Sequence, residues 1–152
     1  TITPTLRLLY RSEVDIDAPL SVGHMAVGER RIINITGGSF RGPRLSGVIL
    51  PGGADWQIIR PDGITAVEAR YTLQTDDGAF IYVDNRGFRH GPNDVMARLA
   101  AGEPVDPSLY YFRTTPVFET GSENYQWLNG IVAVAVGERH ASQVIITVYE
   151  VT

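Results

Sequence analysis

The 152-residue chain contains neither cysteine nor lysine. Without cysteine it has no disulfide framework, no thiolate nucleophile and no cysteine-ligated zinc site. Without lysine it has no Schiff-base chemistry and no P-loop lysine. Its histidines, His24, His90 and His140, stand in isolated, loop-like contexts that lack the spacing of metal ligands. The sequence therefore predicts no metal site and excludes several large classes of enzyme chemistry.

The chain also lacks any apolar run near the ~18 residues that a membrane helix needs. Residues Thr1 to Tyr10 do not show the basic and apolar regions of a secretory signal. The formal net charge is −4, and the 13 basic residues are scattered arginines rather than a basic stripe. We therefore expect a cytoplasmic protein that binds neither membrane nor nucleic acid, folded as a single domain over residues 1–152.

Glycine and proline punctuate short runs rich in Val, Ile, Thr, Tyr and Phe, a pattern typical of strands joined by turns. The fold class expected is all-β. The predicted strands are Thr5–Ile16, Glu29–Thr36, Leu45–Leu50, Trp56–Arg60, Ile64–Gln74, Ala79–Asn85, Tyr110–Thr115, Tyr125–Val136 and Gln143–Val151.

The turns Pro61-Asp62-Gly63 and Asp76-Asp77-Gly78 predict hairpins, because an Asp-Gly step tolerates positive φ. A meander of this many strands removes its edges by closing, so we expect an antiparallel barrel of about eight or nine strands. One short helix, Val95–Ala101, is predicted to cover a barrel end. Asn93 or Asp94 is the expected cap, and Gly102 the expected stop.

The segment from Gly37 to Pro43 and the Gly52-Gly53 pair are dense in glycine, which favours bulges and tight corners. Asp55 follows shortly after the Gly52-Gly53 pair. Its carboxylate beside Trp56 could cap its own turn, or could lie at a pocket mouth with a raised pKa. Both interpretations stay open at this stage.

Two arginines stand on strands with clear alternation. Arg70 shares a face with Glu68, opposite an apolar face, which favours a solvent position unless another subunit covers the outside of the barrel. Arg113 lies between aromatic residues and could stack on a ring and pair with Glu119, or could bind a substrate carboxylate or enolate. Tyr82 is a possible proton donor or a core residue.

Both faces of the predicted strand Tyr125–Val136 are apolar in its second half, which indicates cover by the helix or by another subunit. We therefore expect a homo-oligomer. In the first half, Tyr125, Trp127 and Asn129 precede small residues on one face. They line a ligand pocket or else simply fill a barrel end.

Several linked blocks resemble one protein family, the domain of unknown function 3237, over nearly the whole chain. The blocks are Gly37-Gly38-Ser39-Phe40-x-Gly42, Leu50-Pro51-Gly52-Gly53-Ala54-Asp55-Trp56, Ala69-Arg70-Tyr71, Asp77-Gly78-Ala79, Tyr111-Phe112-Arg113-Thr114, Phe118-Glu119-Thr120 and Tyr125-x-Trp127-Leu128-Asn129.

The resemblance implies a small, often oligomeric, cofactor-free barrel of the allene-oxide-cyclase and calycin-like kind. Such barrels act on apolar organic molecules or merely bind them, so fold alone does not settle function. As a lyase or isomerase, the chain would anchor an aromatic or polyketide-like acid or enol through Arg70 or Arg113. Asp55, Glu119 or Tyr82 would then move a proton for decarboxylation or ring closure. The alternatives are a non-catalytic binding module, with Trp56 among the lining residues, and a structural subunit.

Overall fold

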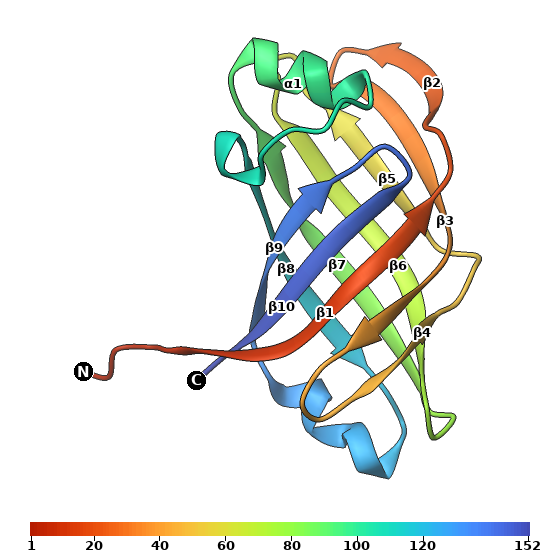
Figure 1. Ribbon diagram of the computed structural model, residues 1–152, viewed down its shortest axis with the longest axis vertical. Helices are drawn as coiled ribbons and strands as arrows, with labels where there is room; N and C mark the ends of the chain where they lie inside the picture. The colour runs from red at the N-terminus through yellow and green to blue at the C-terminus, as the bar shows by residue number, and fades with distance from the viewer.

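The computed structural model describes residues 1–152, which form a closed antiparallel β-barrel with eight wall positions (Figure 1). Seven positions are single strands, while β4 and β5 share the eighth between β3 and β6; β2 pairs only with β3. The strands are β1 (Leu6–Ile16), β2 (Leu20–Met25), β3 (Gly28–Arg41), β4 (Ser46–Ile49), β5 (Ala54–Ile59), β6 (Thr65–Thr75), β7 (Phe80–His90), β8 (Tyr111–Glu119), β9 (Ala133–Arg139) and β10 (Gln143–Val151).

Pairing of β1 with β3 closes the barrel. The register skips a residue there, since Asp15 lies opposite Gly37 whereas Ile16 lies opposite Ile35. Gly38 lies next to this irregularity, opposite Val14, with φ +136°, and a Cβ on it would lie 2.1 Å from the Glu13 carbonyl oxygen. Of the glycines predicted to form bulges or corners, Gly37 and Gly38 lie inside β3, where two backbones approach closely, while Gly42, Gly52 and Gly53 lie in the connections between strands.

Alternation along each strand separates the barrel interior from its outer wall. In β6 every second residue from Thr65 to Thr75 is buried, and the residues between them are partly exposed. The end of the barrel away from α1 is filled by aromatic packing, with the Tyr10 ring 5.4 Å from that of Phe40 and 6.2 Å from that of Phe118. The polar interior described below lies in the other half.

The predicted hairpins and lid helix are present. Gly63 and Gly78 adopt φ +86° and +91° in the turns that join β5 to β6 and β6 to β7. Helix α1 (Asn93–Ala100) covers one end of the barrel, as Figure 1 shows, and Gly102 ends it with φ +76°. No helix in the structure has the length and apolar character required to cross a membrane.

The predicted strand Tyr125–Val136 is wrong in its first half. Residues Glu123–Gly130 form a 3₁₀ helix across the opposite end of the barrel, and β9 begins only at Ala133. Aromatic residues at spacing two mimicked a strand, but their rings lie over the barrel end. A second 3₁₀ turn, Pro107–Leu109, precedes β8.

The structure differs from the prediction in three smaller features. No side chain caps α1, because Pro92 stands immediately before it and Asn93 is its first residue. The rim strand β2 had not been expected. Strands β3, β7, β8 and β9 each run three to five residues past their predicted ends, at Arg41, His90, Glu119 and Arg139.

We predict that Gly38→Ala lowers the free energy of unfolding by about 3 kcal/mol, because it adds a backbone clash to the strain of a positive φ. Gly23→Ala is the matched control. Gly23 also has positive φ, +111°, but no atom lies within 4 Å of the added Cβ, so it should lose only about 1 kcal/mol. Urea unfolding measures both, and equal losses would contradict the role of Gly38 in closure.

Candidate functional site

The two arginines proposed to anchor a ligand project from the outer wall. Arg70 donates a 3.0 Å hydrogen bond to Glu68, and its guanidinium lies 4.6 Å from the centroid of the Trp56 ring. Arg113 donates to the Phe112 carbonyl oxygen at 2.9 Å and lies 5.3 Å from the Tyr111 ring. The structure therefore places neither arginine inside the barrel. Of the structural alternative for Arg113, the stacking on a ring is present and the ion pair with Glu119 is absent.

The other proposed residues also lie away from the interior. Tyr82 and Glu119 face each other across β7 and β8, on the outer wall. Trp56 lies on the same wall. None of the three lines an interior cavity, so the structure does not bring them together with Asp55.

Tyr125, Trp127 and Asn129 belong to the 3₁₀ helix at the end remote from α1. The Tyr125 hydroxyl donates to Asp77 at 3.0 Å, and the Trp127 ring stacks under Arg44 at 3.8 Å. The Asn129 side chain accepts from and donates to the Thr120 backbone, both at 2.8 Å. These contacts fasten the 3₁₀ helix over the barrel end, in keeping with the alternative that they fill it.

Asp55 alone among the proposed catalytic residues points inward. It lines a cavity of about 50 Å³, called here the inner cavity, whose wall includes Gln57 and Asn85. Its two carboxylate oxygens accept from the Glu68 amide at 2.9 Å and from Gln57 Nε2 at 2.7 Å. The Asp55 carboxyl therefore bridges neighbouring strands instead of capping its own turn.

Three arginines that sequence reasoning did not single out enter the same half of the barrel. Arg31 comes from β3, Arg89 from β7 and Arg139 from β9, each at an inward-facing position. Arg89 is only 7% exposed, and its guanidinium makes no hydrogen bond to the protein and lies 5.1 Å from the centroid of the Phe112 ring. None of the three forms an ion pair with a carboxylate.

The uncompensated charge shows in the pKa values of these groups. Burial, assisted by repulsion from Arg139, lowers the pKa of Arg89 to about 10. Burial and repulsion from Arg31 lower the pKa of Arg139. Burial raises the pKa of Asp55, although the hydrogen bond from Gln57 and the attraction of Arg89 oppose this. At neutral pH the arginines still carry their charge, so this end of the barrel is electropositive.

A larger cavity of about 640 Å³, called here the mouth cavity, lies beneath α1. Met96 and Leu99 of the helix form one side, and Arg31 forms part of the other. Arg89 and Arg139 line both this cavity and the inner cavity. Their guanidinium groups therefore stand at the boundary between the two spaces.

Several buried polar atoms at the inner cavity have no partner. They are the side-chain carbonyl oxygens of Gln57 and Asn85 and the hydroxyl of Thr114. An unpaired buried acceptor costs about 1–3 kcal/mol, so these atoms call for a donor within the inner cavity, from a water molecule or a ligand. Nowhere in the structure do three or more histidine or carboxylate side chains gather as a metal site requires.

The sequence did contain a signal for the missed arginines. The predicted strands end at Asn85 and Val136, so Arg89 and Arg139 fall outside them. If the alternation Ile81, Val83, Asn85 is continued, Arg89 falls on the inward face. The series Ala133, Ala135 places Arg139 inward in the same way.

Residues 4–151 match the family model described as "Protein of unknown function (DUF3237)". The chain is 48% identical to a UPF0311 protein of Rhodopseudomonas palustris over 152 residues, covering 99% of both chains. It is 40% identical to a UPF0311 protein of Clostridium acetobutylicum, covering 95% of this chain and 92% of the other. A crystal structure of a conserved R. palustris protein of unknown function superimposes with TM-score 0.95 at 45% identity, covering 100% of both chains.

A more distant similarity reaches the fungus Penicillium herquei. Its hydroalkoxylation enzyme phnH is 31% identical over 99 residues, which span 65% of this chain and 51% of the fungal one. A crystal structure of a P. herquei enzyme matches with TM-score 0.76 at 21% identity, covering 100% of this chain and 97% of the other. At that identity the structural match shows the shared barrel fold only.

We predict that Asp55 makes folding less favourable as pH rises. Because burial raises its pKa, the folded chain keeps a proton that the unfolded chain releases near the ordinary value of 3.8. The free energy of unfolding of wild type minus that of Asp55→Asn should therefore fall between pH 3.8 and the raised pKa and stay low above it. Urea unfolding at pH 3 and pH 8, on either side of this window, measures the difference.

Asp62→Asn is the control for the opposite sign. The Ile64 amide bonds to Asp62 and lowers its pKa, so its stabilising contribution is lost as pH falls through that pKa. A wild-type advantage over Asp55→Asn that grows with pH would show that the arginines hold Asp55 as a carboxylate.

Proposed function

The chain belongs to the DUF3237 family, and from that premise we propose that it binds a small hydroxylated organic acid or enol under α1 and isomerises it by acid–base chemistry at Asp55. The observation that carries the proposal is the pair of guanidinium groups, Arg89 and Arg139, at the boundary of the two cavities. Buried cations without a counter-ion are costly, and an anionic ligand removes that cost.

The two cavities match different parts of such a ligand. A volume of about 640 Å³ is typical of a small-molecule site, and Met96 and Leu99 give the mouth cavity apolar walls for a ring or acyl body. The inner cavity, at about 50 Å³, admits only a small group. A carboxylate or enolate at Arg89 and Arg139 would thus place the reacting end of the ligand next to Asp55.

The buried oxygen atoms that lack a hydrogen-bond partner favour a ligand that carries hydroxyl groups. The side-chain oxygens of Gln57 and Asn85 are acceptors, so they favour a ligand that offers O–H donors. A simple apolar acid would leave them unpaired. Hydroxylated aromatic and polyketide-like acids or enols satisfy both the arginines and these acceptors.

Asp55 has the surroundings of a general acid, because burial favours its neutral form. In an addition of a substrate hydroxyl to a carbon–carbon double bond, the Asp55 carboxyl would give its proton to one alkene carbon. The hydroxyl oxygen would form the new C–O bond at the other carbon, and the hydroxyl proton would return to the Asp55 carboxylate. Within one substrate molecule this is a ring-closing isomerisation that needs no oxidant or reductant. The name of the P. herquei relative, a hydroalkoxylation enzyme, supports this reaction class.

The arginines are predicted to control ligand affinity. Arg89→Gln should weaken binding of a hydroxylated aromatic acid at least tenfold, since it removes a buried charge that contacts the anion. Thermal shift titration measures the affinity of each variant. Arg113→Gln is the control, because Arg113 lies on the outer wall and its loss should leave ligand affinity unchanged. Equal weakening by both variants would contradict the interior site.

Asp55 is predicted to control turnover separately from binding. In a panel of hydroxylated aromatic and polyketide acids followed by mass spectrometry and absorbance, Asp55→Asn should lower kcat at least 100-fold. The amide can keep the bond from Glu68, and a flipped Gln57 can accept from it, so thermal stabilisation by ligand should persist. Binding without turnover by the wild-type chain would identify a binding module instead.

A further inference from the structure

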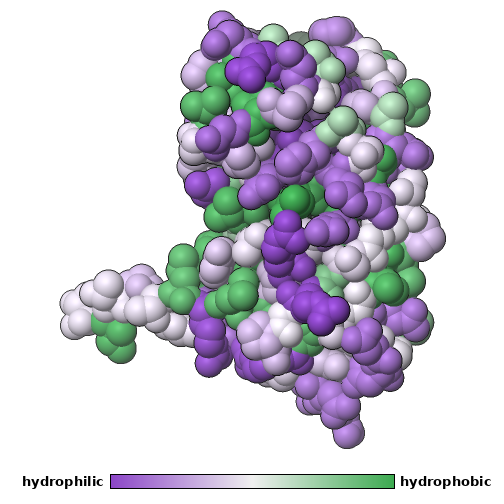
Figure 2. Space-filling view, viewed as in Figure 1, coloured by the Kyte–Doolittle hydropathy of each residue, from purple (hydrophilic) through white to green (hydrophobic).

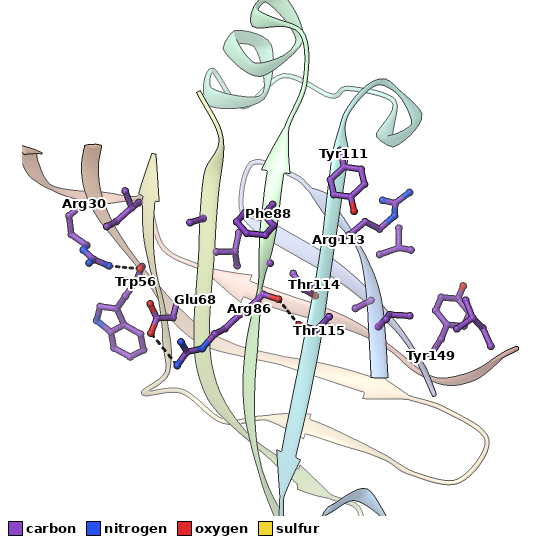
Figure 3. Close-up of a pocket in the computed structure, with 18 residues that line it drawn as sticks. Arg30, Trp56, Glu68, Arg86, Phe88, Tyr111, Arg113, Thr114, Thr115 and Tyr149 are labelled. Carbon is purple, nitrogen blue, oxygen red and sulfur yellow. Dashed lines mark hydrogen bonds and ion pairs between the residues drawn. The ribbon is translucent and has the colours of Figure 1, made fainter. Parts of the chain in front are cut away.

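A shallow depression of about 730 Å³ crosses the outer wall from β5 to β10, and we call it the outer-wall groove (Figure 3). Aromatic side chains from different strands line it, including Trp56, Phe88, Tyr111 and Tyr149. Figure 3 shows them on several strands of one side of the barrel wall. The groove is thus separate from both cavities under α1.

The outer-wall groove leaves apolar surface uncovered. Phe88 is 48% exposed and Tyr111 47% exposed, and Val134 and Val136 continue the apolar floor on β9. Contiguous exposed apolar surface is uncommon on soluble monomers and marks interaction sites. Helix α1 lies over the barrel end and does not cover this wall.

Residues 1–5, called here the arm, show what can cover it. All five are exposed, and the arm stands clear of the barrel in Figures 1 and 2. Thr5 and Thr152 exchange backbone hydrogen bonds of 2.8 and 2.9 Å, which fasten the root of the arm. Beyond that root, Ile2 is 89% exposed.

The arm and the outer-wall groove are continuous and complementary. Leu6, the residue that follows the arm, itself lines the groove. The arm sequence Thr-Ile-Thr-Pro-Thr carries no charged side chain, so the side chains of Ile2 and Pro4 can enter an apolar groove without burying a charge. Pro4 favours an extended backbone, and five extended residues span about 17 Å. Arg113 uses one of its donors on the protein, which leaves others for arm carbonyls.

From this geometry we propose that two copies of the chain pair outer wall to outer wall, with the arm of each lying in the outer-wall groove of the other. Leu6 lines the groove, and the arm begins directly before Leu6. With a two-fold axis near the groove, the arm of each copy would therefore extend over the groove of the other copy. Such an arrangement is self-complementary, as a two-fold interface requires. It also covers Val134, Val136 and Phe88 on both copies.

The absence of natural cysteine allows a direct test by cross-linking. Ile2→Cys and Phe88→Cys variants, purified separately, mixed and oxidised, should give an arm-to-groove disulfide between copies, identified by mass spectrometry. Ile2→Cys with Phe80→Cys is the matched control, because Phe80 is also an exposed phenylalanine of β7 but lies at its other end, outside the groove. Equal yields in both mixtures would overturn the proposal.

Sedimentation of the full chain provides an independent measurement. The wild type should be a dimer at 50 µM, and Phe88→Arg should raise the dimer dissociation constant at least tenfold while Phe80→Arg leaves it unchanged. Circular dichroism verifies that both variants fold. A wild-type monomer, or a dimer insensitive to Phe88→Arg, would overturn the proposal. Ligand binding under α1 is measured separately, so the two proposals can fail independently.

Discussion

Closure of the barrel between β1 and β3 is the constraint on which the other features depend. Because the sheet closes, the barrel has an interior that is shielded from solvent. Arg89 lies in that interior, only 7% exposed and without an ion pair. Closure in turn depends on Gly38, whose backbone passes the Glu13 carbonyl at a distance that no Cβ tolerates. The register skip between Ile35 and Gly37 lies where β3 exchanges β2 for β1 along one edge and β5 for β4 along the other.

The interior divides into two halves of different chemistry. Tyr10, Phe40 and Phe118 fill one half, and the 3₁₀ helix Glu123–Gly130 covers its end. In the other half, Arg31, Arg89 and Arg139 face Asp55 beneath α1. The filled half supplies the packing that stabilises the fold, which permits the other half to keep unpaired charges and unsatisfied acceptors.

Sequence reasoning identified the fold class, the hairpins, the lid helix and the family, because alternation and turn chemistry are local properties. It also singled out Asp55, which follows Gly52-Gly53 and which the structure places at the inner cavity. It missed Arg89 and Arg139 because strand ends are set by pairing with neighbours, and no local signal showed that β7 and β9 continue. Trp127 and Asn129 were misplaced for a related reason: a 3₁₀ helix that packs over a barrel end presents aromatic residues at a spacing that imitates a strand.

The barrel wall is one strand thick, so neighbours in the sequence serve opposite surfaces. Phe88 belongs to the outer-wall groove and Arg89 to the cavities, and Trp56 and Gln57 divide in the same way. Substitution can therefore alter assembly and ligand choice on separate, interleaved sets of positions. Insertion or deletion cannot, because a shift of one residue within β7 exchanges both sets at once. Relatives that diverge in ligand or assembly should accordingly preserve the spacing along these strands more strictly than the side chains, with length changes confined to the loops.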